Sequence, residues 1–329
     1  MGEITDGNCE NPEQQATQFI TDYYTHIVKA EEYQVQDITA EDLKAQCQHD
    51  TQSAPGLDGW AAADLKLLSD KAYGLLADML NAIEGGAPWP AAMTATRAVF
   101  LSKDPDDVHN PLAYRILKIT SGAYRKWASL RMRHLQGWIQ QWDEAAIHAG
   151  TPGKGAFDGW HLTAIDLEHA RTHNLLVAGG SVDIYKCFDQ LNRPLIFELA
   201  KEAGMPRRIL QAYTAYIESM QIQFQVAHTI GKVHKDRCSL PQGCPFSMTM
   251  VALLTKPWLS KMHQAKVTPR CLADDLLIYA TGPHHQSRYI NAMSISRQFF
   301  MDRGAKVATR KCFSFAADYK TRDFLAQYR

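Results

Sequence analysis

Two adjacent aspartates, Asp274 and Asp275, interrupt an apolar stretch of β-type sequence, CLADDLLIYA at residues 271–280. Like charges in contact repel each other, and a carboxylate that is buried without a partner is strongly destabilising. The pair therefore lies either in a solvated turn or beside a cation. Two β-type runs joined by a short polar step are typical of a β-hairpin, so we predict a strand on each side of a tight turn at these aspartates.

The rest of the chain alternates helical and strand patterns. Helical spacing of apolar residues, with capping and stop signals, predicts helices over residues 13–33, from Thr39 onward, and over 61–86, 121–142, 162–174, 192–204, 245–264 and 285–304. Strand patterns occur at 97–101, 114–120, 175–188 and 305–315, and residues 222–240 alternate like a hairpin that turns at Gly231. This order predicts an α+β fold, with an antiparallel sheet that has helices on one face.

Composition excludes several classes of protein. The 329 residues are 46% hydrophobic and 21% charged, which is ordinary for a globular chain with a sizeable core. No apolar run reaches the about 18 residues of a membrane span, and the N-terminus lacks the pattern of a signal peptide. The seven cysteines form no CxxC pair, which favours a reduced, intracellular compartment and argues against a zinc finger. No basic run distinguishes nucleus from cytoplasm.

The zero net charge is the sum of an acidic N-terminal segment and a basic remainder of the chain. Residues 1–50 hold 11 acidic residues against 2 basic ones, which leaves 24 acidic and 33 basic residues of the chain's 35 of each for the remainder. A basic body fits a polyanionic partner, and a solvated surface without a partner has the same asymmetry.

Asp183 supplies a third carboxylate of the same kind, because it ends the apolar strand pattern of the segment SVDIYKCFD. Neighbouring strands that end in Asp and in Asp-Asp can place three carboxylates around one point. Mg²⁺ prefers such oxygen ligands, and two ions about 4 Å apart stabilise the attacking and leaving oxygens of a phosphoryl transfer. The alternative is structural: a hydrophilic turn at 274–275 and a helix cap near the end of the strand.

Seven segments, in order, resemble the motifs of reverse transcriptases. SLPQGCPFSM, LADD and VDIYKCFD are similar to the LPQG, YADD and D-I-x-x-x-F-D elements, with gaps of about 55 and 30 residues between them. SAPGLDGW, LSKDPDDVHNPLAYRIL, AGTPGKGAFDGW and RGAKVATRKCFSF resemble elements of retrotransposons lacking long terminal repeats and of group II intron-like enzymes. The resemblance covers residues 53–315.

The resemblance implies a role for each matching position. Asp183, Asp274 and Asp275 would be the catalytic carboxylates and metal ligands, with Mg²⁺ (which Mn²⁺ can replace) as the cofactor. Lys311 would be a general acid near the leaving pyrophosphate. The nucleotide-binding positions would be Lys103 and Arg115 on the triphosphate, Phe188 under the sugar as a barrier to a 2′-hydroxyl, and Gln242 and Gly243 beside the nucleotide and template base.

The implied architecture is the fingers and palm of a right-hand polymerase, with the thumb absent or truncated. We expect an acidic helical extension at 1–50, fingers at 51–170 and a palm at 171–329, with a finger-like hairpin at about 218–238. The implied function is RNA-directed DNA polymerisation from dNTPs, with an RNA template, a DNA or RNA primer and no membrane partner; another domain or protein that supplies the thumb is a further expected partner.

Two alternatives stay open at this point. One is a catalytically idle scaffold that binds nucleic acid or a protein partner. The other is an RNA-dependent RNA polymerase, against which Phe188 argues.

Overall fold

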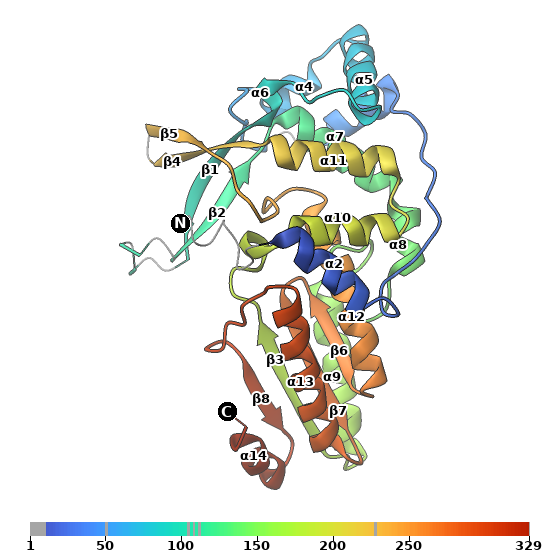
Figure 1. Cartoon of the computed structure of the whole chain (residues 1–329), viewed down its shortest axis with the longest axis vertical. Coiled ribbons are helices and arrows are strands. Elements are labelled where there is room, and N and C mark those ends of the chain that lie inside the picture. The colour runs from blue at the N-terminus through green and yellow to red at the C-terminus, as the bar shows by residue number, and fades with distance from the viewer. Residues whose placement is uncertain are drawn as a thin grey trace. The chain divides into compact units, whose positions relative to one another are not determined.

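The structure of this protein, a computed structural model, describes residues 11–49, 52–103, 106–107, 109–110, 113–226 and 229–328. These residues form two compact units, each built from segments that are distant in the sequence (Figure 1). Unit 1 contains residues 30–138 and 204–247, and unit 2 contains residues 11–29, 139–203 and 248–328. Both helices and strands contribute to each unit, which confirms the predicted α+β class.

Unit 1 is built around a mixed four-stranded sheet. Its elements are α3 (Ala40–Gln48), α4 (Ala62–Lys66), α5 (Asp70–Glu84), α6 (Ala91–Thr94), β1 (Ala95–Ser102), β2 (Tyr114–Ile119), α7 (Gly122–His134), α11 (Arg207–Ser219), β4 (Gln221–Val226) and β5 (Thr229–His234). The strand order is β2-β1-β4-β5, and β1 pairs antiparallel with β2 but parallel with β4. The predicted strands at 97–101 and 114–120 are thus confirmed as the cores of β1 and β2.

The helical part of unit 1 has an aromatic core. Trp89, Tyr124, Trp127 and Tyr216 pack ring against ring, and the rings of Tyr124 and Tyr216 stack with centroids 3.4 Å apart. Such rings bury large apolar areas and prefer these stacked and edge-on geometries. The cluster fixes α7 against α11 within the unit.

Unit 2 contains an antiparallel sheet with the strand order β6-β7-β3-β8. Its elements are α2 (Pro12–Asp22), α9 (Ala156–Thr172), β3 (Val177–Asp183), η2 (Cys187–Gln190), α10 (Arg193–Glu202), α12 (Ser247–Gln264), β6 (Thr268–Leu272), β7 (Asp275–Thr281), α13 (His285–Asp302), β8 (Phe313–Ala316) and α14 (Tyr319–Ala326). The first residue of α12, Ser247, belongs to unit 1, and the rest of the helix belongs to unit 2. In sequence, α8 (Gln136–Trp142) runs across the division between the units.

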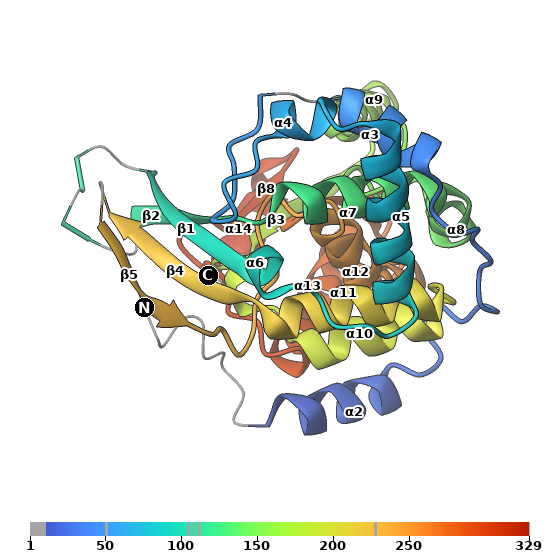
Figure 2. The same cartoon turned by 90° about the horizontal axis from the view of Figure 1, so that it is seen from above.

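Helices cover both faces of this sheet, so the prediction of helices on one face is wrong (Figure 2). A methyl group on Gly180 would meet the Tyr289 hydroxyl of α13 at 2.1 Å, which places α13 on that face. The adjacent residue in the strand faces the other way, and its cross-strand partner Tyr279 donates a hydrogen bond to Asp166 of α9. β3 is therefore buried from both sides, and its small residues allow this close packing.

Several predicted boundaries are corrected by the structure. The helix expected over 61–86 is two helices, because Ser69 accepts a hydrogen bond from the Ala72 amide and caps a new start. The helix expected over 13–33 ends at Asp22. Gly231 lies inside β5 and is not the hairpin turn, and α11 was not predicted at all. The strand expected over 305–315 is reduced to β8, since residues 309–311 form a turn.

Candidate active site

The ends of two adjacent strands bring Asp183 and Asp275 opposite each other. They form the last pair of the antiparallel β3–β7 ladder, so their Cα atoms are direct cross-strand neighbours. β3 reaches this position through the centre of the sheet because Gly179 and Gly180 leave room for Phe315 and Tyr289, which a Cβ atom would meet within 2.5 Å. The alternation of the strands directs Asp183 and Asp275 to the same face.

Asp274 lies in the turn between β6 and β7, as the sequence predicts. The β6–β7 ladder closes with the pair Leu272–Asp275, which leaves Ala273 and Asp274 as a two-residue loop. Ala273 has a φ of 57°, the left-handed conformation that a tight hairpin turn requires and that a non-glycine residue rarely adopts. The turn therefore places a second carboxylate directly beside Asp275.

The like charges disturb one another. Burial raises the pKa of the Asp274 carboxyl above its ordinary value, and the negative charges of Asp275 and Asp183 raise it further. Burial and Asp183 also raise the pKa of Asp275. The positive charge of Lys311 lowers the pKa of both groups and so offsets part of this rise. The three aspartates thus form a site of negative charge that the surrounding protein compensates only in part.

Lys311 contacts the site directly. Its Nζ donates a hydrogen bond to Asp183 Oδ2 over 3.1 Å, and the side chain of Lys311 is 66% exposed. The turn that carries it is attached to the end of β3: the Ala308 amide donates to the Asp183 carbonyl over 2.9 Å, and the Tyr185 amide donates to the Lys306 carbonyl over 2.8 Å. Backbone bonds therefore hold Lys311 beside the carboxylates.

The donor chemistry of this site fits a hard divalent cation. Among the residues that the structure describes, no three His, Cys, Asp or Glu side chains are grouped closely enough to hold a metal ion by themselves. Mg²⁺ does not require such a cage, because one or two carboxylates suffice when substrate phosphates and water supply the other ligands. The raised pKa values of Asp274 and Asp275 indicate a charge that a cation at this position would offset.

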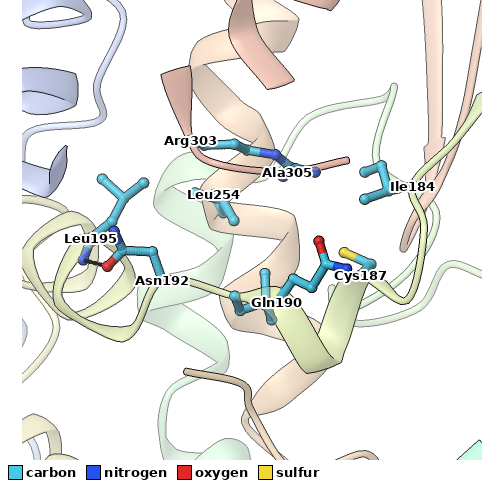
Figure 3. A pocket seen from close by; sticks show the side chains of 9 residues that line it. Ile184, Cys187, Gln190, Asn192, Leu195, Leu254, Arg303 and Ala305 are labelled. Carbon is cyan, nitrogen blue, oxygen red and sulfur yellow. Dashed lines mark hydrogen bonds between the residues drawn. The ribbon is translucent and has the colours of Figure 1, made fainter. Parts of the chain in front are cut away.

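Phe188 follows the strand that carries Asp183. It is half-buried on the short helix η2, while its neighbour Cys187 is buried, and burial raises the pKa of the Cys187 thiol to about 12. Beside η2 is a small cavity, walled among others by Cys187, Leu254 and Arg303 (Figure 3). It has room for about one water molecule, so it is no nucleotide site.

The other predicted site residues lie in unit 1. Arg115 is exposed on β2 opposite Leu101, and the Lys103 amide donates to the Ala113 carbonyl just beyond the end of the same β1–β2 ladder. Gln242 is half-buried and Gly243 exposed in the loop that precedes α12. Gly243 has a φ of 92°, and nothing lies within 4 Å of where a Cβ would be. The structure thus brings together Asp183, Asp274, Asp275 and Lys311 within unit 2, and Lys103 with Arg115 within unit 1.

Sequence reasoning missed the burial of several basic side chains, among them Arg303 and Lys118. Arg303, 4% exposed, follows α13 and lines the cavity beside η2. Lys118, 7% exposed, lies on β2 and contacts Asp236 and Ser239. A lysine inside the apolar strand pattern YRILKIT was a usable signal for the second, because a buried ammonium requires a partner. No comparable pattern marked Arg303.

Comparison with known protein families identifies a related family. A family model described as reverse transcriptase (RNA-dependent DNA polymerase) matches residues 103–327, which include all the predicted site residues. No curated protein matches the chain. Within the described ranges, no helix combines the length and the apolar character that crossing a bilayer requires.

Proposed function

The chain belongs to the reverse transcriptase (RNA-dependent DNA polymerase) family, and we propose that it is an RNA-directed DNA polymerase that extends a primer 3′-hydroxyl with dNTPs. Family membership implies binding of a nucleic-acid template, a primer and dNTPs. The observation that carries the proposal is the pairing of Asp183 with Asp275, with Asp274 in the adjoining turn and Lys311 on Asp183. Those are the groups that a phosphoryl transfer needs around its reacting oxygens.

Members of this family generally use a divalent metal ion. We assign Asp183, Asp274 and Asp275 as the residues that would hold Mg²⁺, or Mn²⁺ in its place, because their carboxylates gather at one end of the unit 2 sheet. When bound, the ions would lower the pKa of the primer hydroxyl and neutralise charge on the attacking and leaving oxygens. The protein's own contribution is to position Asp183 and Asp275 on two paired strands and Asp274 in the tight turn that joins β6 to β7.

Lys311 is proposed as the proton donor to the leaving pyrophosphate. Its Nζ is held at 3.1 Å from Asp183 Oδ2 by a turn that is bonded to β3. Its high exposure leaves the ammonium group accessible to a substrate phosphate. In this scheme the ammonium exchanges its contact with Asp183 for one with the triphosphate and releases its proton there.

The remaining assignments concern the nucleotide. Lys103 and Arg115 would bind the triphosphate, and the planar guanidinium of Arg115 suits a bidentate phosphate contact. Gln242 and Gly243 would face the nucleotide and the template base. Phe188 would exclude a 2′-hydroxyl, so a Phe188→Val variant should accept ribonucleotides about tenfold more readily in a single-nucleotide incorporation assay. Unchanged sugar selection would remove Phe188 from this role.

The domain assignment is part of the proposal. We assign residues 51–170 to the fingers and 171–329 to the palm, with 1–50 as an acidic helical extension. The hairpin at about 218–238 is assigned a finger-like role, which the pairing of β4 with β1 in the unit 1 sheet supports. We also propose an origin in retrotransposons lacking long terminal repeats or in group II intron-like elements, on the motifs alone.

The decisive experiment is primer extension on an RNA template with an annealed DNA primer, in Mg²⁺ and separately in Mn²⁺. The wild-type chain is compared with an Asp274→Ala/Asp275→Ala double variant and with Glu198→Ala, which changes an exposed acid of unit 2 on α10. We expect template-dependent, dideoxynucleotide-sensitive extension by the wild type and by Glu198→Ala, and none by the double variant. If a folded wild-type chain binds primer–template but never extends it, the polymerase proposal is wrong and the idle-scaffold interpretation replaces it.

A further inference from the structure

The loop that carries Gln242 and Gly243 is anchored at both ends. At its C-terminal end, Ser247 Oγ donates to the Pro241 carbonyl over 2.9 Å, and the Cys244 amide donates to the same carbonyl over 3.1 Å. Phe246, which directly precedes Ser247, is fully buried against the rings of Trp127 and Tyr213. The exposed part of the loop at Gly243 is thus followed by a buried anchor at Phe246.

The N-terminal end is anchored by a buried polar triangle. Lys118 Nζ donates to Asp236 Oδ2 and, over 2.6 Å, to Ser239 Oγ, which in turn donates to Asp236 Oδ2 over 3.0 Å. Lys118 and Asp236 are each 7% exposed and Ser239 is fully buried. Every contact in the triangle is therefore made away from water, where hydrogen bonds between charged groups are strong and specific in direction.

Ser239 shows that this anchor acts on the backbone. It has a φ of 85°, a conformation that is unfavourable for any residue except glycine. Such a conformation persists only where the surroundings hold it, and the hydroxyl of Ser239 is the group held by Lys118 and Asp236. Because Ser239 is the third residue before Gln242, its backbone direction sets the course of the loop.

β2 connects this anchor to a second nucleotide-binding element. Lys118 is buried on β2, three residues after the exposed Arg115, and both are paired with β1. One strand therefore carries Arg115 outward toward the solvent and Lys118 inward to the loop. A shift of β2 would move Lys118 and Arg115 together. The ion pair of Lys118 therefore affects the position of a proposed triphosphate-binding residue as well as the stability of the fold.

We propose that Lys118, through Asp236 and Ser239, is a positioning residue that holds the 241–243 loop in the geometry that receives the incoming nucleotide. This inference rests on the proposed polymerase function. An ion pair that served the fold alone would be replaceable by well-packed apolar side chains, since such replacement is often neutral or stabilising.

The test uses the full chain with a Lys118→Met/Asp236→Leu double variant, which leaves the net charge unchanged. The matched control is Lys44→Met/Asp70→Leu, the same exchange at an exposed ion pair of unit 1. We expect the first variant to remain folded, with kcat/KM for dNTP reduced about 10-fold to 100-fold through KM and with KM for primer–template unchanged. A purely structural role would lower only the active fraction, and so kcat. The control should match the wild type.

Amide hydrogen exchange provides a readout that does not depend on activity. The amides of Cys244 and Ser247, bonded to Pro241 and Cys244, should exchange about tenfold faster in the double variant, with amides of β1 and β2 unchanged. If the double variant fails to fold, Ser239→Ala removes a single hydroxyl and should change both readouts in the same direction. A wild-type chain without polymerase activity would refute the proposed function, while faster loop exchange would still support the anchor. Unchanged exchange and unchanged KM for dNTP would overturn the inference.

Discussion

Two acidic sites, one in each unit, differ in how far the surrounding protein compensates their negative charge. In unit 1, Glu84 is 1% exposed, and each of its carboxylate oxygens accepts two hydrogen bonds, from Trp127 and Arg131 on Oε1 and from Arg131 and Arg208 on Oε2. In unit 2, burial and like charges raise the pKa of Asp274 and Asp275, and Lys311 compensates only in part. A saturated carboxylate stabilises a fold, whereas an unsaturated group of carboxylates has capacity left for a ligand.

The largest expected effect separates activity from stability at the unsaturated site. Asp275→Asn should lower the rate of nucleotide incorporation by about 10³-fold, because it removes one of the carboxylates proposed to hold the metal ions. The same change should leave the melting temperature equal or higher, since it removes a repelled charge. Single-turnover incorporation and thermal melting measure the two effects. Asp323→Asn, an exposed position on α14, is the control; a variant that loses both activity and stability would contradict the comparison.

At the saturated site the expected effects are reversed. Glu84→Ala leaves the charge of the fully buried Arg131 without its carboxylate partner, so the free energy of unfolding should fall by about 3–5 kcal/mol. Incorporation per folded molecule should stay near the wild-type value. Urea unfolding measures the loss of stability, and Glu198→Ala at an exposed pair should stay within about 0.5 kcal/mol. A loss no larger than that of the control would show that Glu84 is not structural.

The pH dependence of stability should sharpen the comparison. For Asp274 and Asp275 the folded-state pKa is raised above the unfolded value of about 3.9, so the folded chain binds these protons more tightly than the unfolded chain. The stability they contribute is fully present below that value and is lost as pH rises through the raised pKa. The melting temperature of the wild type should therefore fall, relative to that of Asp274→Asn/Asp275→Asn, as the pH rises above about 4.

Magnesium should reverse that difference at pH 7. Added Mg²⁺ should raise the melting temperature of the wild type and leave that of the double variant unchanged, because a ligand stabilises only the state that binds it. Parallel melting curves with pH would show that folding does not raise the pKa values of these carboxylates, and an equal Mg²⁺ shift in both proteins would show that they do not bind the ion.

The smallest expected effect concerns the turn itself. Ala273→Gly relieves the left-handed conformation of Ala273 but adds freedom to the unfolded chain, so stability should change by less than about 1 kcal/mol. Incorporation should be nearly unchanged, since no side chain is lost from the site. Equilibrium unfolding checks the first point. A loss of several kcal/mol would show that the Ala273 methyl group packs in a way that the hairpin needs.

Local signals in the sequence predicted the hairpin best. Asp-Asp between two β-type runs located the β6–β7 turn, and the helix predicted from Thr39 onward does begin there, with Thr39 and Asp42 forming a capping box. Both features are decided by residues within a few positions of each other. The break of the 61–86 helix at Ser69 was also local, but its capping signal was hidden in an apolar run that reads as continuous helix.

Long-range features could not be predicted in the same way. The parallel pairing of β1 with β4, and the burial of β3 between α9 and α13, depend on segments far apart in the chain. Arg303 likewise has no sequence signal, because its burial is decided by how α13 ends against η2 and α12. Of the site, the carboxylates were found by motif order, while Lys118 required the three-dimensional structure to reveal its partners.

The sheet of unit 1 has a consequence for synthesis on the ribosome. β1 and β2 emerge as a hairpin, but β4, the parallel neighbour of β1, begins at Gln221, about 100 residues after β2 ends at Ile119. At a translation rate of about 5–20 residues per second, one edge of β1 stays unpaired for roughly 5–20 s until β4 is synthesised. During that interval an open edge is available to any other nascent strand, which is a route to aggregation. Slow translation of this interval would favour chaperone capture, and fast translation would favour correct closure.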